Sequence, residues 1–145
     1  TKNINVMIRK APISMIMTER VITLNKTDSL EKAEYLFKHH NIRHIPVVEG
    51  KAVVGMLSYT DLMRLSFADI TNEDEADIDA LVYSMFTINQ IMKKKVICVS
   101  PSNSIKEVAE ILATREFHAL PVVDNNRLIG IVTTTDLIKY LLKQF

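Results

Sequence analysis

Two short stretches of the sequence place a hydroxyl residue three positions before an aspartate. The first reads GMLSYTDL, with Ser58 and Asp61, and the second reads GIVTTTDL, with Thr133 and Asp136. In both, an apolar run ends in polar residues, which is typical of a strand that leads into a helix. The first turn of a helix has free backbone N–H groups and the positive end of the helix dipole, so this junction is a candidate anion site.

These side chains favour different parts of a ligand. Hydroxyl groups that can donate hydrogen bonds to a phosphate are carried by Ser58, Thr60, Thr133 and Thr135. A carboxylate would repel the same phosphate, so Asp61 and Asp136 are expected to face neutral hydroxyl donors, as an acid faces ribose in dinucleotide-binding folds. The alternative is that each Thr-Asp pair only caps a helix. Because hydroxyl and acid recur together in both stretches, we favour ligand binding.

The two stretches are parts of a longer internal repeat. Residues 16 to 65 align with residues 91 to 140 without a gap, at a constant offset of 75 positions. The identities cluster in a Pro-Val-Val block and in the Gly-x-x-[Ser/Thr]-x-Thr-Asp-Leu block. A unit of about 50 residues with one exposed sheet face buries too little apolar area to be stable alone. The two copies are therefore expected to pack face to face with pseudo-two-fold symmetry.

Each copy is expected to contain a strand, a helix, a two-stranded hairpin and a second helix. In the first copy, residues 21 to 24 are predicted as the first strand, and apolar residues at helical spacing follow between Leu30 and His40. In the second copy, Ser104 and Glu107 have capping-box spacing, which predicts the start of the same helix. HIPVVEGKAVVGMLS and ALPVVDNNRLIGIVT each predict a hairpin, and the Thr of Thr-Asp-Leu is predicted to be the N-cap of the second helix. The predicted fold class is α/β (α+β), with two β-α-β-β-α repeats.

The repeat divides the chain into three parts. Residues 1–70 are predicted to form repeat 1, residues 71–90 an acidic linker and helix, and residues 91–145 repeat 2. Five acids fall between Glu73 and Asp79, ahead of an apolar group made of Leu81, Val82, Met85 and Ile88. This pattern predicts an exposed acidic turn that leads into a helix. A divalent-cation site is the alternative, but the helix dipole already favours acids at a helix start.

Composition and charge exclude several classes of protein. A chain of 145 residues with 48% hydrophobic content can form one globular body, and its net charge of +1 gives no strong attraction to nucleic acid or to an anionic membrane. The single cysteine, Cys98, cannot form an internal disulfide. No apolar run approaches the roughly 18 residues of a membrane span. We therefore expect a cytoplasmic protein with no nucleic-acid or membrane partner.

In these motifs the chain resembles the CBS domain pair, also called the Bateman module. The resemblance rests on IMTERVITL and IMKKKVICV, on IRHIPVV and FHALPVV, and on GMLSYTD and GIVTTTD, and it covers essentially the whole chain. It implies a regulatory module that binds adenosine compounds such as AMP, ADP, ATP or S-adenosylmethionine in two clefts between paired sheets. It also implies a homodimer, and no cofactor is expected to be required.

The resemblance further implies which residues form each cleft. The Asp of one repeat would hold ribose, while the other repeat would contribute residues around its first strand and ahead of its Pro-Val. One cleft would combine Thr133, Thr135 and Asp136 with Thr18, Val21, Ile22, Arg43 and His44. The other would combine Ser58, Thr60 and Asp61 with Lys93, Val96, Ile97 and His118, with Arg115 as an additional candidate.

Basic residues ahead of the Pro-Val block distinguish the two predicted clefts. Members of the family often place basic residues there to meet phosphates, and Arg43 and His44 fit that pattern. The second copy departs from it, because His118 is followed by Ala119. A guanidinium fork matches phosphate oxygens, whereas a methyl group does not. The cleft with Asp136, Arg43 and His44 is therefore expected to bind phosphorylated ligands more tightly.

An enzyme is the weaker hypothesis, since neither a general base nor a metal site emerges from the sequence. His39, His40 and His44 invite a metal site, but a helix is expected to end near Asn41 and no Cys or acid completes a tetrahedral set. Cys98 is expected to be a buried structural thiol within a strand, because no base partner is identifiable.

The leading hypothesis is a sensor of adenine nucleotides that changes conformation on binding. The alternatives are a ligand-free dimerisation or docking module, and a sensor of S-adenosylmethionine or of a cyclic dinucleotide. No catalytic, channel or DNA-binding domain is recognisable, so the module would regulate an unidentified protein in trans or be part of a larger chain. A homodimer is expected because the second helices carry apolar residues that one small core cannot bury completely, namely Met63, Leu65, Phe67, Tyr140, Leu141 and Phe145.

Overall fold

The computed structural model describes residues 10–67 and 81–145. The chain forms two compact units, of which one is a continuous stretch and the other combines two separate segments. Residues Ile22–Val96 form one unit, which contains most of the first copy and is called the first-copy unit here. Residues Thr1–Val21 and Ile97–Phe145 form the other, called the second-copy unit.

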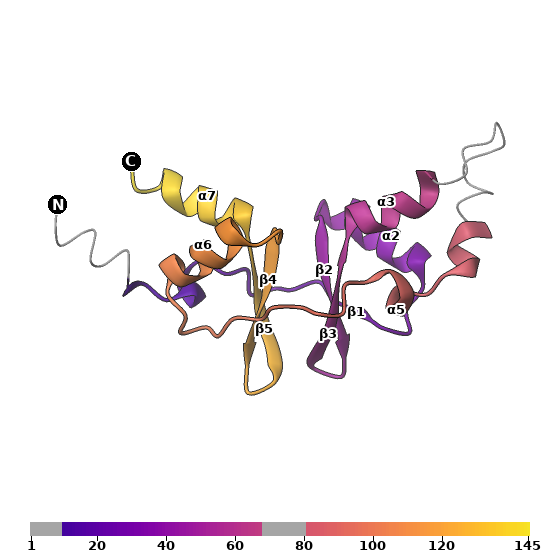
Figure 1. The fold of residues 1–145 in the computed structure, drawn as a ribbon, viewed down its shortest axis with the longest axis horizontal. Helices are drawn as coiled ribbons and strands as arrows, with labels where there is room; N and C mark the ends of the chain where they lie inside the picture. Colours follow the sequence, from indigo (N-terminus) through magenta and orange to yellow (C-terminus); the bar gives the residue numbers. More distant parts are fainter. Residues whose placement is uncertain (1–9, 68–80) are drawn as a thin grey trace. The chain divides into compact units, whose positions relative to one another are not determined.

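The first-copy unit contains a three-stranded sheet with helices beside it (Figure 1). Its elements are β1 (Leu24–Asn25), α2 (Leu30–His40), β2 (His44–Glu49), β3 (Ala52–Ser58), α3 (Tyr59–Phe67) and α5 (Ile88–Ile91). Residues 81–85 are also helical. β1 pairs in parallel with β2, and β2 pairs antiparallel with β3.

The second-copy unit repeats this order. Its elements are η1 (Ile13–Met15), α6 (Ile105–Thr114), β4 (Ala119–Asp124), β5 (Arg127–Thr133) and α7 (Thr134–Leu142). β4 and β5 form an antiparallel hairpin, and a single parallel bridge between Val99 and Val122 takes the place of β1. The predicted class of two β-α-β-β-α repeats is confirmed.

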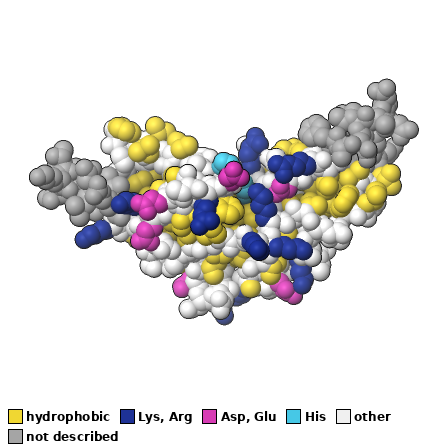
Figure 2. Space-filling model, in the orientation of Figure 1, with side chains coloured by type: hydrophobic (Ala, Val, Ile, Leu, Met, Phe, Trp, Pro, Cys, Tyr) yellow, Lys and Arg dark blue, Asp and Glu magenta, His cyan; other side chains and the backbone are white. Residues whose placement is uncertain are grey.

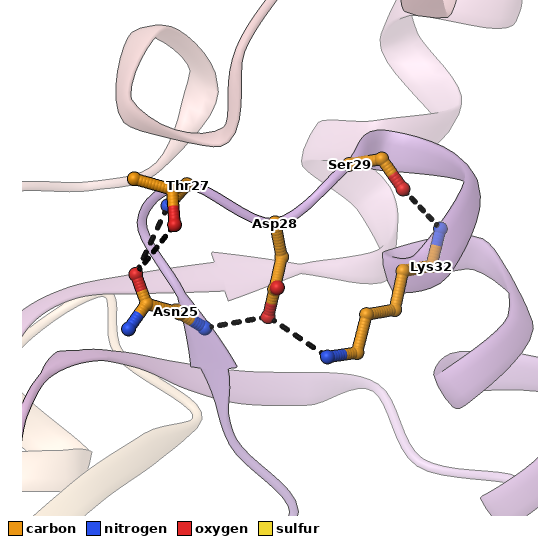
Figure 3. A network of polar contacts seen from close by, with 5 residues as sticks. All are labelled: Asn25, Thr27, Asp28, Ser29 and Lys32. Atoms are coloured by element: carbon orange, nitrogen blue, oxygen red, sulfur yellow. Dashed lines mark hydrogen bonds and ion pairs between the residues drawn. The ribbon is translucent and has the colours of Figure 1, made fainter.

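Local hydrogen bonds fix where the first helix of each copy begins. In the first copy, Ser29 Oγ accepts from the Lys32 N–H at 3.1 Å (Figure 3). In the turn before it, Asp28 Oδ2 accepts from the Asn25 N–H at 2.8 Å and from Lys32 Nζ at 3.1 Å. In the second copy, Ser104 Oγ accepts from the Glu107 N–H at 3.1 Å, which confirms the predicted start of α6.

The predicted end of α2 is confirmed, but the predicted first strand is only partly correct. α2 ends at His40, with Asn41 in the left-handed conformation at φ 51°, where the sequence predicts an end. The first strand was predicted over residues 21 to 24, but only Leu24 and Asn25 pair with β2. The β-branched character of residues 21 to 23 indicates an extended backbone, whereas strand pairing also requires a neighbour within hydrogen-bond distance. The acids from Glu73 to Asp79 lie outside the described residues.

A connecting segment completes the core of each unit. Ile13 precedes the first copy in sequence, yet it is fully buried in the core of the second-copy unit. Its N–H donates to the Asn103 carbonyl at 2.7 Å, and the Ile105 N–H donates to the Ala11 carbonyl at 2.8 Å. Ile88, which precedes the second copy, is fully buried in the core of the first-copy unit. Each copy is therefore closed by the segment that leads into the other copy.

A polar contact also links the second connecting segment to α2. Burial raises the pKa of Glu34, but the hydrogen bond and the charge of Lys38, together with the nearby Tyr83 hydroxyl, lower the pKa below its ordinary value overall. Lys38 Nζ lies 2.6 Å from Glu34 Oε1. Tyr83 belongs to the helical residues 81–85 and is 4% exposed, so its ring packs in the core while its hydroxyl meets α2.

Two glycines allow the connecting segments to approach the hairpins. A Cβ on Gly130 would lie 2.6 Å from Met17 Sδ and 3.2 Å from the Thr18 carbonyl oxygen. A Cβ on Gly55 would collide with Met92 Sδ and would lie 3.0 Å from the carbonyl oxygen of Lys93. A larger residue at either position would push the segment away from the strand. The Gly in the repeated Gly-x-x-[Ser/Thr] block therefore positions the chain next to the hydroxyl–acid pair.

Candidate functional site

The hydroxyl and the acid of each repeated pair form a reciprocal cap at the start of the second helix. In α7, Thr133 Oγ1 accepts from the Asp136 N–H at 3.1 Å, and Asp136 Oδ2 accepts from the Thr133 N–H at 2.9 Å. At α3, Ser58 Oγ accepts from the Asp61 N–H at 3.0 Å, and Asp61 Oδ2 accepts from the Ser58 N–H at 3.4 Å. The capping alternative for these residues is therefore correct as a description of the local structure.

The cap lies two residues earlier than the sequence predicts. Thr60 and Thr135 were predicted as N-caps, but α3 begins at Tyr59 and α7 at Thr134, so Ser58 and Thr133 accept the capping bonds. The reason is spacing, since Asp at the third helical position can return a bond to the N-cap N–H, which forms a capping box. Thr60 and Thr135 are left exposed in the first helical turn.

Capping uses only one oxygen of each aspartate. Asp136 Oδ1 makes no hydrogen bond or ion pair within the part of the chain that the structure describes. Asp61 Oδ1 lies 3.6 Å from Arg64 Nη1, a contact that was not predicted although the i,i+3 spacing of the two residues indicates it. A carboxylate with one oxygen fixed by the backbone and the other available can accept a hydrogen bond from a ligand hydroxyl.

The connecting segments bring a second group of predicted residues close to each cap. The backbones of Thr18 and Ile131 exchange hydrogen bonds of 2.8 and 3.0 Å, and Ile131 lies two positions before Thr133. Lys93 and Met56 exchange two bonds of 2.9 Å, and Met56 lies two positions before Ser58. Thr18 is thus held beside β5 in the second-copy unit, and Lys93 beside β3 in the first-copy unit.

The residues ahead of each Pro-Val block lie at the same end of their hairpin as the cap. The Tyr59 N–H donates to the Arg43 carbonyl at 2.8 Å, and His44 pairs with Ser58 across β2 and β3. In the second-copy unit, the Thr134 N–H and Oγ1 donate to the His118 carbonyl at 3.0 and 3.1 Å. Each helix start is therefore surrounded by a hydroxyl, an acid and a basic residue of its own unit.

Both predicted clefts draw on both units. In the first cleft, the second-copy unit contributes Thr18, Val21, Thr133, Thr135 and Asp136, and the first-copy unit contributes Ile22, Arg43 and His44. In the second cleft, the first-copy unit contributes Ser58, Thr60, Asp61, Lys93 and Val96, and the second-copy unit contributes Ile97, His118 and Arg115. None of these residues is buried, so their side chains are available for contacts. The combination of the two groups in one cleft stays a prediction.

The histidines on α2 take part in ring contacts. His39 stacks on Tyr35 with ring centroids 5.1 Å apart, and His40 meets His39 edge to face at 4.8 Å. Within residues 10–67 and 81–145, no group of three His, Cys, Asp or Glu side chains could hold a metal ion. A shallow surface pocket on α2 is lined by Glu31, Glu34, Tyr35, Lys38 and His39, none of which is a predicted site residue.

The prediction for Cys98 was wrong in its burial. The residue is exposed and lies outside the strands, just before the bridge at Val99. Its apolar neighbours in sequence suggested a strand, but the second copy replaces β1 with that single bridge. Partial burial raises the pKa of the Cys98 thiol, which disfavours the nucleophilic thiolate.

Among the described helices, none is long and apolar enough to cross a membrane.

Comparisons with known proteins agree on the family. The CBS domain family matches residues 13–68 and again residues 88–143. CBS domain-containing protein YhcV of Bacillus subtilis is 28% identical over 83% of this chain and 79% of its own length. Protein MJ1225 of Methanocaldococcus jannaschii is 30% identical over 86% of this chain, which spans only 45% of that relative.

A solved structure supports the same assignment. The CBS domain pair of protein MJ0100, in complex with 5'-methylthioadenosine and S-adenosyl-L-methionine, superimposes with a TM-score of 0.76 at 25% identity. The match covers 93% of this chain and 98% of that one. The two matched regions contain the two copies of the internal repeat, residues 16–65 and 91–140. The chain belongs to the CBS domain family and carries two tandem CBS domains.

Proposed function

We propose that this chain is a regulatory module that senses an adenine nucleotide of the AMP, ADP or ATP type and changes conformation when it binds. The observation that carries the proposal is the cap of α7, where Asp136 keeps Oδ1 available while Thr133 fixes Oδ2. The MJ0100 pair, whose ligands are both adenosine compounds, supports the same ligand class. In this proposal, the aspartate holds the ribose hydroxyls and the hydroxyl and basic residues face the phosphates.

The mechanism we propose is a shift between two arrangements of the units. A ligand held by Asp136 in the second-copy unit and by Arg43 in the first-copy unit would bind one arrangement more tightly than the other. Differential affinity is what allows a ligand to shift a conformational equilibrium. The favoured arrangement would present a different surface to a regulated protein. The module would need no cofactor, would catalyse no reaction and would act in the cytoplasm.

A panel of melting curves tests this function. Adenosine, AMP, ADP and ATP are added at concentrations from micromolar to millimolar, with GMP as the matched nucleotide control. A ligand that binds only the native state stabilises it by about 2.7 kcal/mol at 100 times its Kd, so the melting temperature is expected to rise by several degrees. GMP is expected to have a smaller effect. A flat response to every adenine compound would contradict the proposal and favour a docking module.

S-adenosylmethionine is the second candidate ligand, because the MJ0100 pair binds it together with 5'-methylthioadenosine. The sulfonium ligand carries a positive charge near the ribose and no phosphate. Arg43 would then have no phosphate to contact. Including S-adenosylmethionine and 5'-methylthioadenosine in the melting panel separates the two candidates, since only a nucleotide sensor prefers AMP or ATP over both.

Arg43→Ala is expected to weaken binding of AMP and ATP on the order of five-fold, with little effect on adenosine. Arg43 is exposed, and its guanidinium can pair with phosphate oxygens at a strength typical of a solvent-exposed charge. Calorimetric titrations at fixed salt measure the three affinities. Lys51→Ala is the matched control, because Lys51 is an exposed cation at the opposite end of the same hairpin. Equal losses for adenosine and ATP would refute a phosphate contact.

A homodimer is expected to form through α7. Of the apolar residues that were predicted to stay unburied, Met63 and Leu65 pack against the core of the first-copy unit and Tyr140 packs against that of the second-copy unit. α7 exposes apolar side chains at i, i+3 and i+4, namely Ile138, Leu141 and Leu142, and Phe145 is exposed just beyond the end of the helix. Figure 2 shows apolar side chains gathered over this helix. Phe67 at the end of α3 was also predicted to carry an unburied apolar side chain, but that side chain lies outside the described residues.

Light scattering at micromolar concentration is expected to give twice the chain mass of 16.5 kDa. Leu142→Asp is expected to shift the protein toward the monomer, because a carboxylate in an apolar interface loses its hydration. Gln144→Asp, which adds the same charge beside these apolar side chains, serves as the control. A mass near 16.5 kDa for the unmodified chain, with and without ATP, would rule out this assembly.

A further inference from the structure

The two repeated aspartates differ in what their second oxygen contacts. Asp61 Oδ1 lies 3.6 Å from Arg64 Nη1, one helical turn further along α3. The matching position in α7 is Lys139, and no ion pair joins it to Asp136 among the described residues. The capping bond differs as well, at 3.4 Å for Asp61 and 2.9 Å for Asp136. The Asp61 carboxylate is therefore shared between the cap and a cation, whereas the Asp136 carboxylate contacts only the cap within residues 10–67 and 81–145.

Burial makes this difference relevant to a ligand. The side chain of Asp61 is 11% exposed, while that of Arg64 is 75% exposed. Little of the Asp61 carboxylate thus faces solvent, and the cap already uses Oδ2. Oδ1 is the oxygen that remains for a ligand hydroxyl, and it is the oxygen that Arg64 approaches. A ligand at this cap has to compete with a guanidinium for the same acceptor.

We propose that Arg64 sets the affinity of the Asp61 site, because its guanidinium competes with the ligand's hydroxyl groups for Asp61 Oδ1. This inference rests on the proposed function, in which an aspartate at each cap holds the ribose of an adenosine compound. The Asp61 site is the weaker of the two for this reason, independently of the basic residues that contact phosphate. Arg64 is an affinity-determining residue that the ligand displaces.

Two backgrounds isolate the two sites. Asp136→Asn leaves the Asp61 site as the site with an intact acid, and Asp61→Asn leaves the Asp136 site. Arg64→Gln is added to the first background, and Lys139→Gln, the matched change, is added to the second. Adenosine is the probe, because an uncharged ligand does not respond to the loss of a distant positive charge. Calorimetry measures each affinity.

Arg64→Gln is expected to strengthen adenosine binding in the Asp136→Asn background by about two- to five-fold, the range of a partly exposed ion pair. Lys139→Gln is expected to leave adenosine affinity unchanged in its background. Salt provides a second readout, because it screens the competing ion pair. Raising NaCl from about 0.05 to about 0.5 M is expected to tighten adenosine binding in Asp136→Asn, but not when Arg64→Gln is also present.

The possible outcomes distinguish a failure of the proposed Arg64 role from a failure of the proposed sensor function. Unchanged or weaker adenosine binding after Arg64→Gln overturns the role of Arg64. The same holds if adenosine does not bind the Asp136→Asn background, whether or not Arg64→Gln is present. In both cases the proposed sensor function still stands as long as the wild type binds adenosine. A loss for AMP that exceeds the loss for adenosine would also overturn it, since Arg64 would then contact phosphate. If adenosine, AMP, ATP and S-adenosylmethionine all fail to bind the wild type, the proposed function fails, and the inference fails with it.

Discussion

Asp136→Asn is expected to weaken adenosine and AMP binding by roughly ten- to a hundred-fold at its site, while the protein keeps its fold. Hydrogen bonds to a charged group contribute roughly 1.5 to 3 kcal/mol, and every 1.4 kcal/mol corresponds to about a factor of ten in affinity. The asparagine carbonyl can still accept from the Thr133 N–H, which Asp136 Oδ2 accepts at 2.9 Å. The second oxygen is replaced by an amide donor, so the ligand hydroxyls lose their acceptor.

This substitution separates two roles that alanine would combine. Asp136→Ala removes the ligand's acceptor and also the bond to the N-cap, so a fall in affinity could follow from a frayed helix start. Calorimetry with adenosine and AMP on Asp136→Asn, together with a melting curve of the free protein, distinguishes these effects. Asp124→Asn, at the exposed end of β4, removes the same charge away from the cap and serves as the control. Unchanged affinities in both Asp136→Asn and Asp61→Asn would refute the ribose role.

Ile13→Ala is expected to lower the free energy of unfolding by about 2 to 5 kcal/mol and to weaken the second-copy unit rather than the first. Ile13 is fully buried in the core that α6, β4 and β5 also build. Removing three carbons there loses apolar burial and leaves a cavity. Denaturant unfolding measures the total loss, and amide hydrogen exchange locates it, with faster exchange expected in β4 and β5 than in β2 and β3.

A matched substitution in the same turn provides the control. Met15 belongs to η1 as Ile13 does, but it is 67% exposed, so Met15→Ala is expected to change stability by no more than about 0.5 kcal/mol. Ile88→Ala is the reciprocal test, because Ile88 closes the first-copy unit. Faster exchange in β2 and β3 after Ile13→Ala, or equal losses for Ile13→Ala and Met15→Ala, would contradict the assignment of this segment.

Features encoded by neighbouring residues were predicted from the sequence. Ser104 and Glu107 marked the start of α6, and α2 ended before Asn41 as expected. The internal repeat gave both hairpins and the β-α-β-β-α order, and it located the hydroxyl–acid pairs at the starts of α3 and α7. These features depend on local hydrogen bonds and on the periodicity of apolar residues, which a short stretch of sequence contains in full.

The position of the cap was predicted only to within two residues. Thr60 and Thr135 are suitable N-cap residue types, and so are Ser58 and Thr133. The reciprocal bond from Asp61 or Asp136 decides between them, because it requires the acid three residues after the cap. The contact of Arg64 with Asp61, and its absence at Lys139, likewise depend on side-chain geometry that two similar sequences do not distinguish.

Tertiary structure alone decided which core each connecting segment completes. Apolar residues such as Ile13 and Ile88 indicate that both segments are buried somewhere, and their sequence positions suggest the copy that follows. The backbone bonds from Thr18 to Ile131 and from Lys93 to Met56 instead join each segment to the copy that does not follow it. Burial of apolar surface is non-directional, so a sequence pattern determines that a segment is buried but not against which partner. Gly55 and Gly130 leave room for a methionine thioether and for the backbone of the connecting segment, and this close approach is visible only in the tertiary structure.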